Sequence, residues 1–280
     1  MNEFYLSEIN IYPIKSLGGI SLKEANIEEK GLQYDRRWML IDDEGTFISQ
    51  RKYAELAMLQ VSIADGNLTI SHKTFSQQTI SFSLEENTGK SIIVSIWDNI
   101  SSGLEVSAEV SRWFSDFMKM NVRLVKMPQE EKRIVDPRYA LNNEIVSFAD
   151  GYPSLIIGQS ALNGLNEKLS EPILMDRFRP NLVFTGGAPH AEDRFKSFYL
   201  GDVLFSAVKP CARCILITIN QQTGEKGKEP LRTLAKYRTA GKKILFGQNL
   251  IHKGLGRICV GDELKVVEWK PEKENLIFNL

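Results

Sequence analysis

The chain has 280 residues, of which 42% are hydrophobic and 25% are charged, and both values are typical of a globular protein. This composition excludes a disordered, collagen-like or coiled-coil chain, and the length allows one large domain or two ordinary ones. Lysine plus arginine and aspartate plus glutamate both number 35, so the net charge is zero and no overall field attracts nucleic acid or an anionic membrane.

The N-terminus and the cysteine count indicate where the protein works. Residues 1–4 include a glutamate where a signal peptide would be positively charged, and no apolar run approaches the roughly 20 residues that span a bilayer. Three cysteines, an odd number, argue against a secreted disulfide framework. We therefore expect a cytoplasmic protein without a nucleic-acid or membrane partner, whose thiols are free for structure, metal binding or chemistry.

The first hundred residues read as strands and turns, because apolar and polar positions alternate between clusters of Asp, Gly and Asn. After a strand at Ile9 and Ile11, one hairpin is predicted from 38–41 to 47–48 and a second from 59–63 to 68–70. Strands at 80–84 and 92–97 continue this meander or barrel pattern. Apolar residues spaced three and four apart then predict a core helix over 110–118, followed by a strand that starts at Val122.

A polar stretch over 128–152 interrupts the periodicity, and we interpret it as a linker or as a lid over a substrate site. The predicted domains are accordingly residues 1–125 and 126–270. The second half should contain a strand at 154–157, a short helix near Ser160, and two segments, 198–204 and 257–264, in which a Gly-Asp turn joins apolar strands as in barrel hairpins. The expected fold class is mainly β with a few helices (α+β).

The most informative string is Lys209-Pro210-Cys211-Ala212-Arg213-Cys214, followed by residues 215–217, which we predict to form a strand. Nearby Lys and Arg favour thiolates, which are good ligands for soft metals. A structural zinc site is disfavoured because there is no second C-x-x-C and the three histidines are scattered. A thioredoxin-type motif would need a helix after the second cysteine.

Three basic residues lie beside predicted strand ends, where functional groups often gather. They are Lys15, followed by Ser16, then Arg36, and Arg179. The turn Gly158-Gln159-Ser160 begins a predicted helix, whose backbone N–H groups favour an anion. If the fold brings these groups together, they could hold a phosphate.

Taken in order, these strings resemble the MOSC family, the molybdenum-cofactor proteins that include the amidoxime-reducing components. The matching strings, which span nearly the whole chain, are Tyr12-Pro13-Ile14-Lys15-Ser16, Asp35-Arg36-Arg37-Trp38, Phe148-Ala149-Asp150, Phe178-Arg179-Pro180-Asn181, Ala191-Glu192-Asp193, Leu200-Gly201-Asp202, Cys211-Ala212-Arg213-Cys214, Thr223-Gly224 and Leu245-Phe246-Gly247-Gln248-Asn249.

The resemblance implies an N-terminal β-barrel domain followed by a MOSC domain, and a bound molybdenum cofactor (Mo-molybdopterin). By motif match, Cys214 would be the metal ligand and the catalytic residue. The residues implied to hold the cofactor are Lys15, Ser16, Arg36 and Arg179, and less directly Gly158, Gln159, Ser160, Ala212, Arg213 and Asn249. Cys211 would then be a structural residue, or would support Cys214 without binding the metal itself.

The implied activity is the reduction of N-hydroxylated compounds (amidoximes, hydroxylamines, N-hydroxylated bases) by removal of oxygen at molybdenum. The chain has no cysteine beyond Cys259 to hold an iron–sulfur cluster, so we expect a separate electron-donor protein of ferredoxin, flavin or cytochrome type. Two alternatives remain open. The chain could carry molybdenum cofactor or persulfide sulfur on Cys214 without turning over a small molecule, or it could be a thiol redox protein that uses Cys211 and Cys214.

Overall fold

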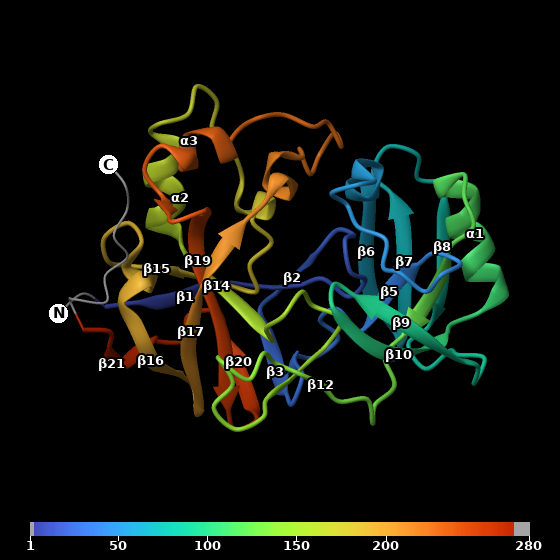
Figure 1. The fold of residues 1–280 in the computed structure, drawn as a ribbon, viewed down its shortest axis with the longest axis horizontal. Helices are drawn as coiled ribbons and strands as arrows, with labels where there is room; N and C mark the ends of the chain where they lie inside the picture. The colour runs from blue at the N-terminus through green and yellow to red at the C-terminus, as the bar shows by residue number, and fades with distance from the viewer. Residues whose placement is uncertain (1–2, 272–280) are drawn as a thin grey trace.

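Strands dominate the computed structural model, which describes residues 3–271 and confirms the predicted fold class. Figure 1 shows two lobes, one built mainly from the middle of the first half of the chain and one mainly from the second half, with β2 and β3 between them. No helix within residues 3–271 is both long enough and apolar enough to cross a bilayer.

The first lobe contains two antiparallel sheets, one α-helix and one 3₁₀ helix. One sheet has the strand order β5-β11-β10-β9 and the other β6-β7-β8. Their bounds are β5 Trp38–Ile41, β6 Leu59–Ala64, β7 Asn67–His72, β8 Thr79–Ser83, β9 Ser91–Ile96, β10 Asn99–Glu105 and β11 Arg123–Lys126, with the 3₁₀ helix η1 Ala54–Met58 before β6 and α1 Ala108–Met118 before β11.

Most predicted elements of this lobe are confirmed. The β6–β7 hairpin forms through Asp65 and Gly66, both with positive φ. The predicted hairpin from 38–41 to 47–48 forms in part: Ile41 bridges Phe47, the Asp42 N–H bonds the Thr46 carbonyl (3.0 Å) and the Ile48 N–H bonds the Leu40 carbonyl (2.8 Å). The full-length partner of β5 is β11. Helix α1 buries Val110, Phe114 and Met118 on the predicted face.

The second lobe is built on a large sheet with the order β2-β1-β15-β14-β19-β17-β16-β21, where β18 also pairs with β19. The bounds are β1 Tyr5–Ile11, β2 Ile20–Leu22, β14 Ser154–Gly158, β15 Leu182–Thr185, β16 Phe195–Leu200, β17 Val203–Arg213, β18 Thr239–Ala240, β19 Lys243–Lys253 and β21 Lys265–Trp269. The helices are α2 Gln159–Asn166, α3 Leu231–Ala235, η2 Met175–Arg177, η3 Ala191–Arg194 and η4 Ile215–Thr218.

The N-terminal strands belong to this second lobe. Strand β1 pairs with β15, and β3 (Glu24–Glu28) joins β4 (Gly31–Leu32) and β20 (Gly256–Cys259) in a small sheet. Apolar residues of β1 and β3 are accordingly buried in the same cluster as those of β15 and β16. The two halves of the sequence are therefore interleaved in space, and the division at residues 125 and 126 stays a prediction.

One of the two predicted Gly-Asp hairpins is wrong. Gly201 and Asp202 do join β16 to β17 as a hairpin. Gly261 and Asp262 instead lead from β20 to β21, which lie in different sheets. The physical reason is β1: Leu6 donates its N–H to the Asp262 carbonyl (2.9 Å) and accepts the Gly261 N–H (2.8 Å), which fixes the turn against the large sheet.

The polar stretch 128–152 contains a short hairpin, β12 (Arg133–Ile134) and β13 (Ile145–Val146). Arg133 is 5% exposed and ties this stretch together by donating hydrogen bonds to the carbonyls of Ser147, Ala149 and Asp150. It also bonds the Asn99 side chain at the start of β10, in the other lobe. Whether the stretch acts as a lid stays a prediction, for which limited proteolysis with and without substrate is the measurement.

Candidate functional site

A pocket between the two lobes brings together eight of the eleven predicted site residues. They are Lys15, Ser16, Arg36, Arg179, Ala212, Arg213, Cys214 and Asn249. They come from the segment after β1, the turn before β5, the segment before β15, the end of β17 and the middle of β19. The turn that contains Gly158, Gln159 and Ser160 does not line this pocket.

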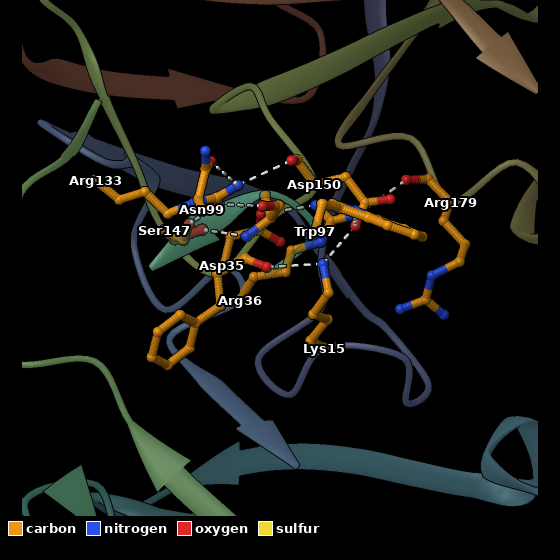
Figure 2. Close-up of polar contacts among 11 residues, drawn as sticks. Lys15, Asp35, Arg36, Trp97, Asn99, Arg133, Ser147, Asp150 and Arg179 are labelled. Carbon is orange, nitrogen blue, oxygen red and sulfur yellow. Dashed lines mark hydrogen bonds and ion pairs between the residues drawn. The ribbon is translucent and has the colours of Figure 1, made fainter. Parts of the chain in front are cut away.

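Lys15 is buried at the rim of the first lobe. Its N–H bonds the Trp38 carbonyl (2.8 Å), and Ser16 after it has a φ of 74°, so the backbone turns sharply and directs the lysine inward. The Lys15 Nζ donates to the Phe148 carbonyl (2.8 Å) and to Oδ1 of Asp150 (2.5 Å), as Figure 2 shows. Burial lowers the pKa of Lys15 to about 8, although the Asp150 carboxylate opposes this shift.

Phosphate binding by the chain is expected to weaken as the pH rises through about 8, because the Lys15 ammonium then loses its proton. The other charged groups that act on Lys15 are Asp150, Arg133 and Arg36. Titration calorimetry with inorganic phosphate between pH 7 and 9, below the pKa of about 10 of Arg179, measures the effect. In Lys15→Arg the guanidinium stays charged over this range, so the weakening should disappear; an unchanged pH profile in that variant would contradict the assignment.

Arg36 and Arg179 meet around Tyr12. The fully buried Asp35 carboxylate accepts the Tyr12 N–H (2.8 Å) and Nη1 of Arg36 (2.7 Å). Arg36 also bonds Asn181 Oδ1 (3.0 Å) and the Arg179 carbonyl (3.3 Å), which fixes its guanidinium. Both arginines have a positive φ, 49° and 53°, a conformation that bulky residues adopt where the fold enforces it, often at functional sites.

Arg179 carries a charge that the described residues do not neutralise. It is 8% exposed, its guanidinium lies 4.1 Å from the centre of the Tyr12 ring, and burial lowers its pKa to about 10. Within residues 3–271 no side chain or carbonyl forms a hydrogen bond or ion pair with that guanidinium. Figure 2 shows it directed away from the Lys15–Asp150 network. A buried cation without a partner requires an anion.

Cys214 is the exposed thiol of the pocket, and it follows the last residue of β17. The predicted strand at 215–217 is wrong: these residues begin the 3₁₀ helix η4, in which the Ile217 N–H bonds the Cys214 carbonyl (3.4 Å). Ile215 is 57% exposed and only Ile217 of the three is buried, so the apolar run has no sheet to join. The preceding Arg213 is held by bonds to the Phe246 and Phe178 carbonyls (2.8 and 3.0 Å).

Cys211 differs from Cys214 in its surroundings. Burial raises the pKa of the Cys211 thiol, and this outweighs the opposing effect of Arg213 and Lys209. The expectation that neighbouring cations favour both thiolates is therefore wrong for Cys211. Because metals bind the thiolate, Cys214 is the better candidate ligand of the two.

The backbone N–H of Gly158 donates a hydrogen bond to a buried carboxyl group. The Gly158 N–H donates to Oε1 of Glu192 (3.3 Å), and a Cβ at position 158 would lie 3.1 Å from Glu192 Oε2. Gln159 bonds Asn163 and Ser160 bonds the Ala188 carbonyl. The N–H of the residue before this helix is thus used by the protein's own carboxyl group, and the turn does not line the pocket. The sequence could not show this, since Glu192 is 34 residues away.

Replacing Glu192 by glutamine is expected to remove a pH dependence of stability, so that the change in unfolding free energy is more favourable at pH 8 than at pH 5 by roughly 3 kcal/mol. Burial, followed by the neighbouring Asp193, raises the pKa of Glu192 from 4.5 to about 7. The folded state therefore holds an extra proton between pH 4.5 and 7, and this contribution to stability is lost as the pH rises through 7. Urea unfolding at pH 5 and pH 8 measures it; the exposed Glu171→Gln serves as control, and equal stability changes at both pH values would contradict the assignment.

The pocket also contains residues that sequence reasoning did not assign to it. Asp150 accepts hydrogen bonds from both Lys15 and the Trp97 indole N–H (3.2 Å), and Arg51 lines the wall near them. Asp150 is part of a matching string, so the motif offered a signal for it. Arg51 lies in no such string, and only the structure places it in the pocket.

The donors present fit an anionic, sulfur-ligated metal cofactor. Arg179 requires an anion, Nη2 of Arg213 is a buried donor for which residues 3–271 supply no partner, and Cys214 presents an accessible thiol in the same pocket. A phosphate suits the guanidinium groups and a thiolate suits a soft metal.

The comparisons with known proteins agree with the motif resemblance. Residues 3–121 match the model of the MOSC N-terminal beta barrel domain, and residues 143–265 match that of the MOSC domain. Mitochondrial amidoxime-reducing component 1 of Mus musculus is 31% identical over 274 residues, with 92% of this chain and 80% of the relative covered. The Homo sapiens protein of the same name is 29% identical over 276 residues, with 92% and 81% covered.

A second group of relatives is longer. Molybdenum cofactor sulfurase of Oryza sativa subsp. japonica is 30% identical over 266 residues, which cover 88% of this chain but 32% of the sulfurase. The chain therefore spans about a third of that relative's length.

Proposed function

The chain belongs to the MOSC family, and from this premise we propose that it binds a molybdenum cofactor and reduces N-hydroxylated compounds by removing their oxygen. The observation that carries the proposal is the convergence in one pocket of an exposed Cys214 with Arg179, whose guanidinium has no hydrogen-bond or ion-pair partner among residues 3–271. The similarity in length and sequence to the amidoxime-reducing components supports the reductase over other activities of the family.

Each residue of the pocket has a proposed task. Cys214 would supply the protein thiolate to the metal, and Lys15 and Arg179 would hold the phosphate. Arg36 and Ser16 would fix the neighbouring part of the cofactor, while Ala212, Arg213 and Asn249 would shape its wall. The bound cofactor supplies the two-electron redox chemistry, and the protein contributes binding, orientation and a charged environment. Electrons would come from a separate donor protein.

The test is molybdenum content together with turnover. Protein produced in a host that makes the cofactor should contain close to one molybdenum per chain and should reduce benzamidoxime with a chemical reductant. Absence of molybdenum would overturn the proposal. Molybdenum without turnover of any N-hydroxylated compound would favour the second candidate, a carrier of cofactor or of persulfide sulfur, which the similarity to molybdenum cofactor sulfurase keeps open.

A further inference from the structure

The pocket contains more positive charge than one phosphate group uses. Five basic side chains line it: Lys15, Arg36, Arg51, Arg179 and Arg213. Lys15 is paired with Asp150, Arg36 is paired with Asp35, and Arg213 bonds backbone carbonyls. Arg179 is assigned to the cofactor by motif. Arg51 remains, and no residue that the structure describes forms a hydrogen bond or ion pair with its guanidinium.

Arg51 is held in place by an aromatic ring. Its guanidinium lies 3.9 Å from the centre of the Trp97 ring, at cation–π distance. Trp97 itself is fixed by its indole N–H bond to Asp150 (3.2 Å, Figure 2) and by an edge contact with Phe47, whose ring centre is 4.9 Å away. The guanidinium is therefore oriented before any ligand binds, and its hydrogen-bond donors are free.

Trp97 is the first residue of the two-residue loop that joins β9 to β10. It forms the turn between β9 and β10 with a φ of 55°, which large residues rarely adopt, and its side chain is 49% exposed. A two-residue hairpin loop requires a positive φ at its first position, so the hairpin accounts for this backbone conformation, whereas the half-exposed ring is not part of the core. The turn places the ring where it can support Arg51 at the pocket wall.

We propose that Arg51 binds an oxyanion group of the substrate, so that the site prefers N-hydroxylated compounds bearing a carboxylate or phosphonate over their neutral analogues. This inference rests on the proposed function. A planar guanidinium matches a carboxylate or a phosphorus oxyanion by two parallel hydrogen bonds. Asp150, the acid whose pKa Arg51 helps to lower, is already engaged by Lys15 and Trp97 and does not occupy these donors.

The test compares benzamidoxime with its 4-carboxy and 4-phosphonate derivatives on the holoenzyme. We expect kcat/KM to be about tenfold higher for at least one of the anionic substrates, mainly through a lower KM. Arg51→Gln should reduce that ratio to near one, and Arg51→Lys, which keeps the charge but loses the planar fork, should restore part of it. The derivative, carboxylate or phosphonate, with the larger increase in kcat/KM identifies the oxyanion that the site prefers.

A matched control is provided by Lys52→Gln, which removes the same charge one residue further along, at an exposed position outside the pocket. Its substrate ratio should equal that of the wild type. If Arg51→Gln keeps the wild-type ratio, or if it loses molybdenum, Arg51 serves the fold or the cofactor and the inference is overturned.

A binding measurement separates failure of this inference from failure of the proposed function. Tryptophan fluorescence of the holoenzyme should report benzoate binding at least tenfold tighter than benzamide binding, with the signal lost in Trp97→Phe and the preference lost in Arg51→Gln. If no substrate turns over but this preference holds, the oxyanion site stands and the reductase function falls. Equal affinities for the two probes would overturn the oxyanion site itself.

Discussion

If Cys214 is the metal ligand that we propose, replacing it by alanine is expected to lower the rate of benzamidoxime reduction at least about a hundredfold, because loss of a ligand should exceed the 10- to 100-fold effect of changing a supporting residue. Molybdenum retention should fall much less, since Lys15, Arg36 and Arg179 lie elsewhere in the pocket and keep their contacts. Reduction kinetics with a chemical electron donor, and elemental analysis of the same samples, measure the two effects separately.

The matched control for this variant is Cys259→Ala. Cys259 is also a free, partly accessible cysteine, but it lies in β20, where it pairs with Glu24, and does not line the pocket. Its activity should equal that of the wild type. Full activity in Cys214→Ala would remove the proposed metal ligand, and an equal loss in both variants would point to a general effect of thiol removal.

Replacing Arg133 by methionine is expected to destabilise the fold by roughly 3 to 5 kcal/mol. The guanidinium donates to three backbone carbonyls of residues 147–150 and to the Asn99 side chain. Ser147 and Ala149 are buried, whereas Asp150 and Asn99 are exposed, so the loss comes mainly from the two buried carbonyls. Methionine keeps the apolar stem but leaves the carbonyls without a donor. Urea unfolding followed by circular dichroism measures the loss.

The same polar stretch offers a control at Arg138, whose side chain is 80% exposed and bonds Asp136 two residues away. An exposed ion pair contributes little to stability, so Arg138→Met should unfold at nearly the wild-type urea concentration. Comparable midpoints for the two variants would show that the buried carbonyls around Arg133 find other partners. Because the Phe148 carbonyl and Asp150 hold Lys15, Arg133→Met should also weaken phosphate binding.

Local sequence patterns predicted the elements of the first lobe well, because alternation and helical spacing report directly on which side chains are buried. Helix α1 and the β6–β7 hairpin are examples. The same rule failed at residues 215–217, where an apolar run follows a strand but faces solvent at Ile215. Whether such a run continues a strand depends on a neighbour that the run itself does not encode.

The residues of the candidate site also fall into two groups, those that the sequence predicted and those that only the structure shows. Motif matching found Lys15, Arg36, Arg179 and Cys214, whose strings have a distinctive order, and the fold brings them into one pocket. The predicted helix start added Gly158 to the site, because such a start is a general anion site; the Gly158 N–H instead bonds Glu192, which is distant in sequence. Arg51 had no local signal, since an isolated arginine in a polar segment resembles any surface arginine.

The pairing of β1 with β15 also constrains the order in which a growing chain can fold. Ile9 leaves the ribosome long before its partner Leu182, and the edge of β1 must wait unpaired while more than half of the protein is synthesised. The sheets between Trp38 and Lys126, by contrast, close on partners within the same stretch. The middle of the chain can therefore reach its final structure first, and the pocket, whose walls come from both ends, is assembled last.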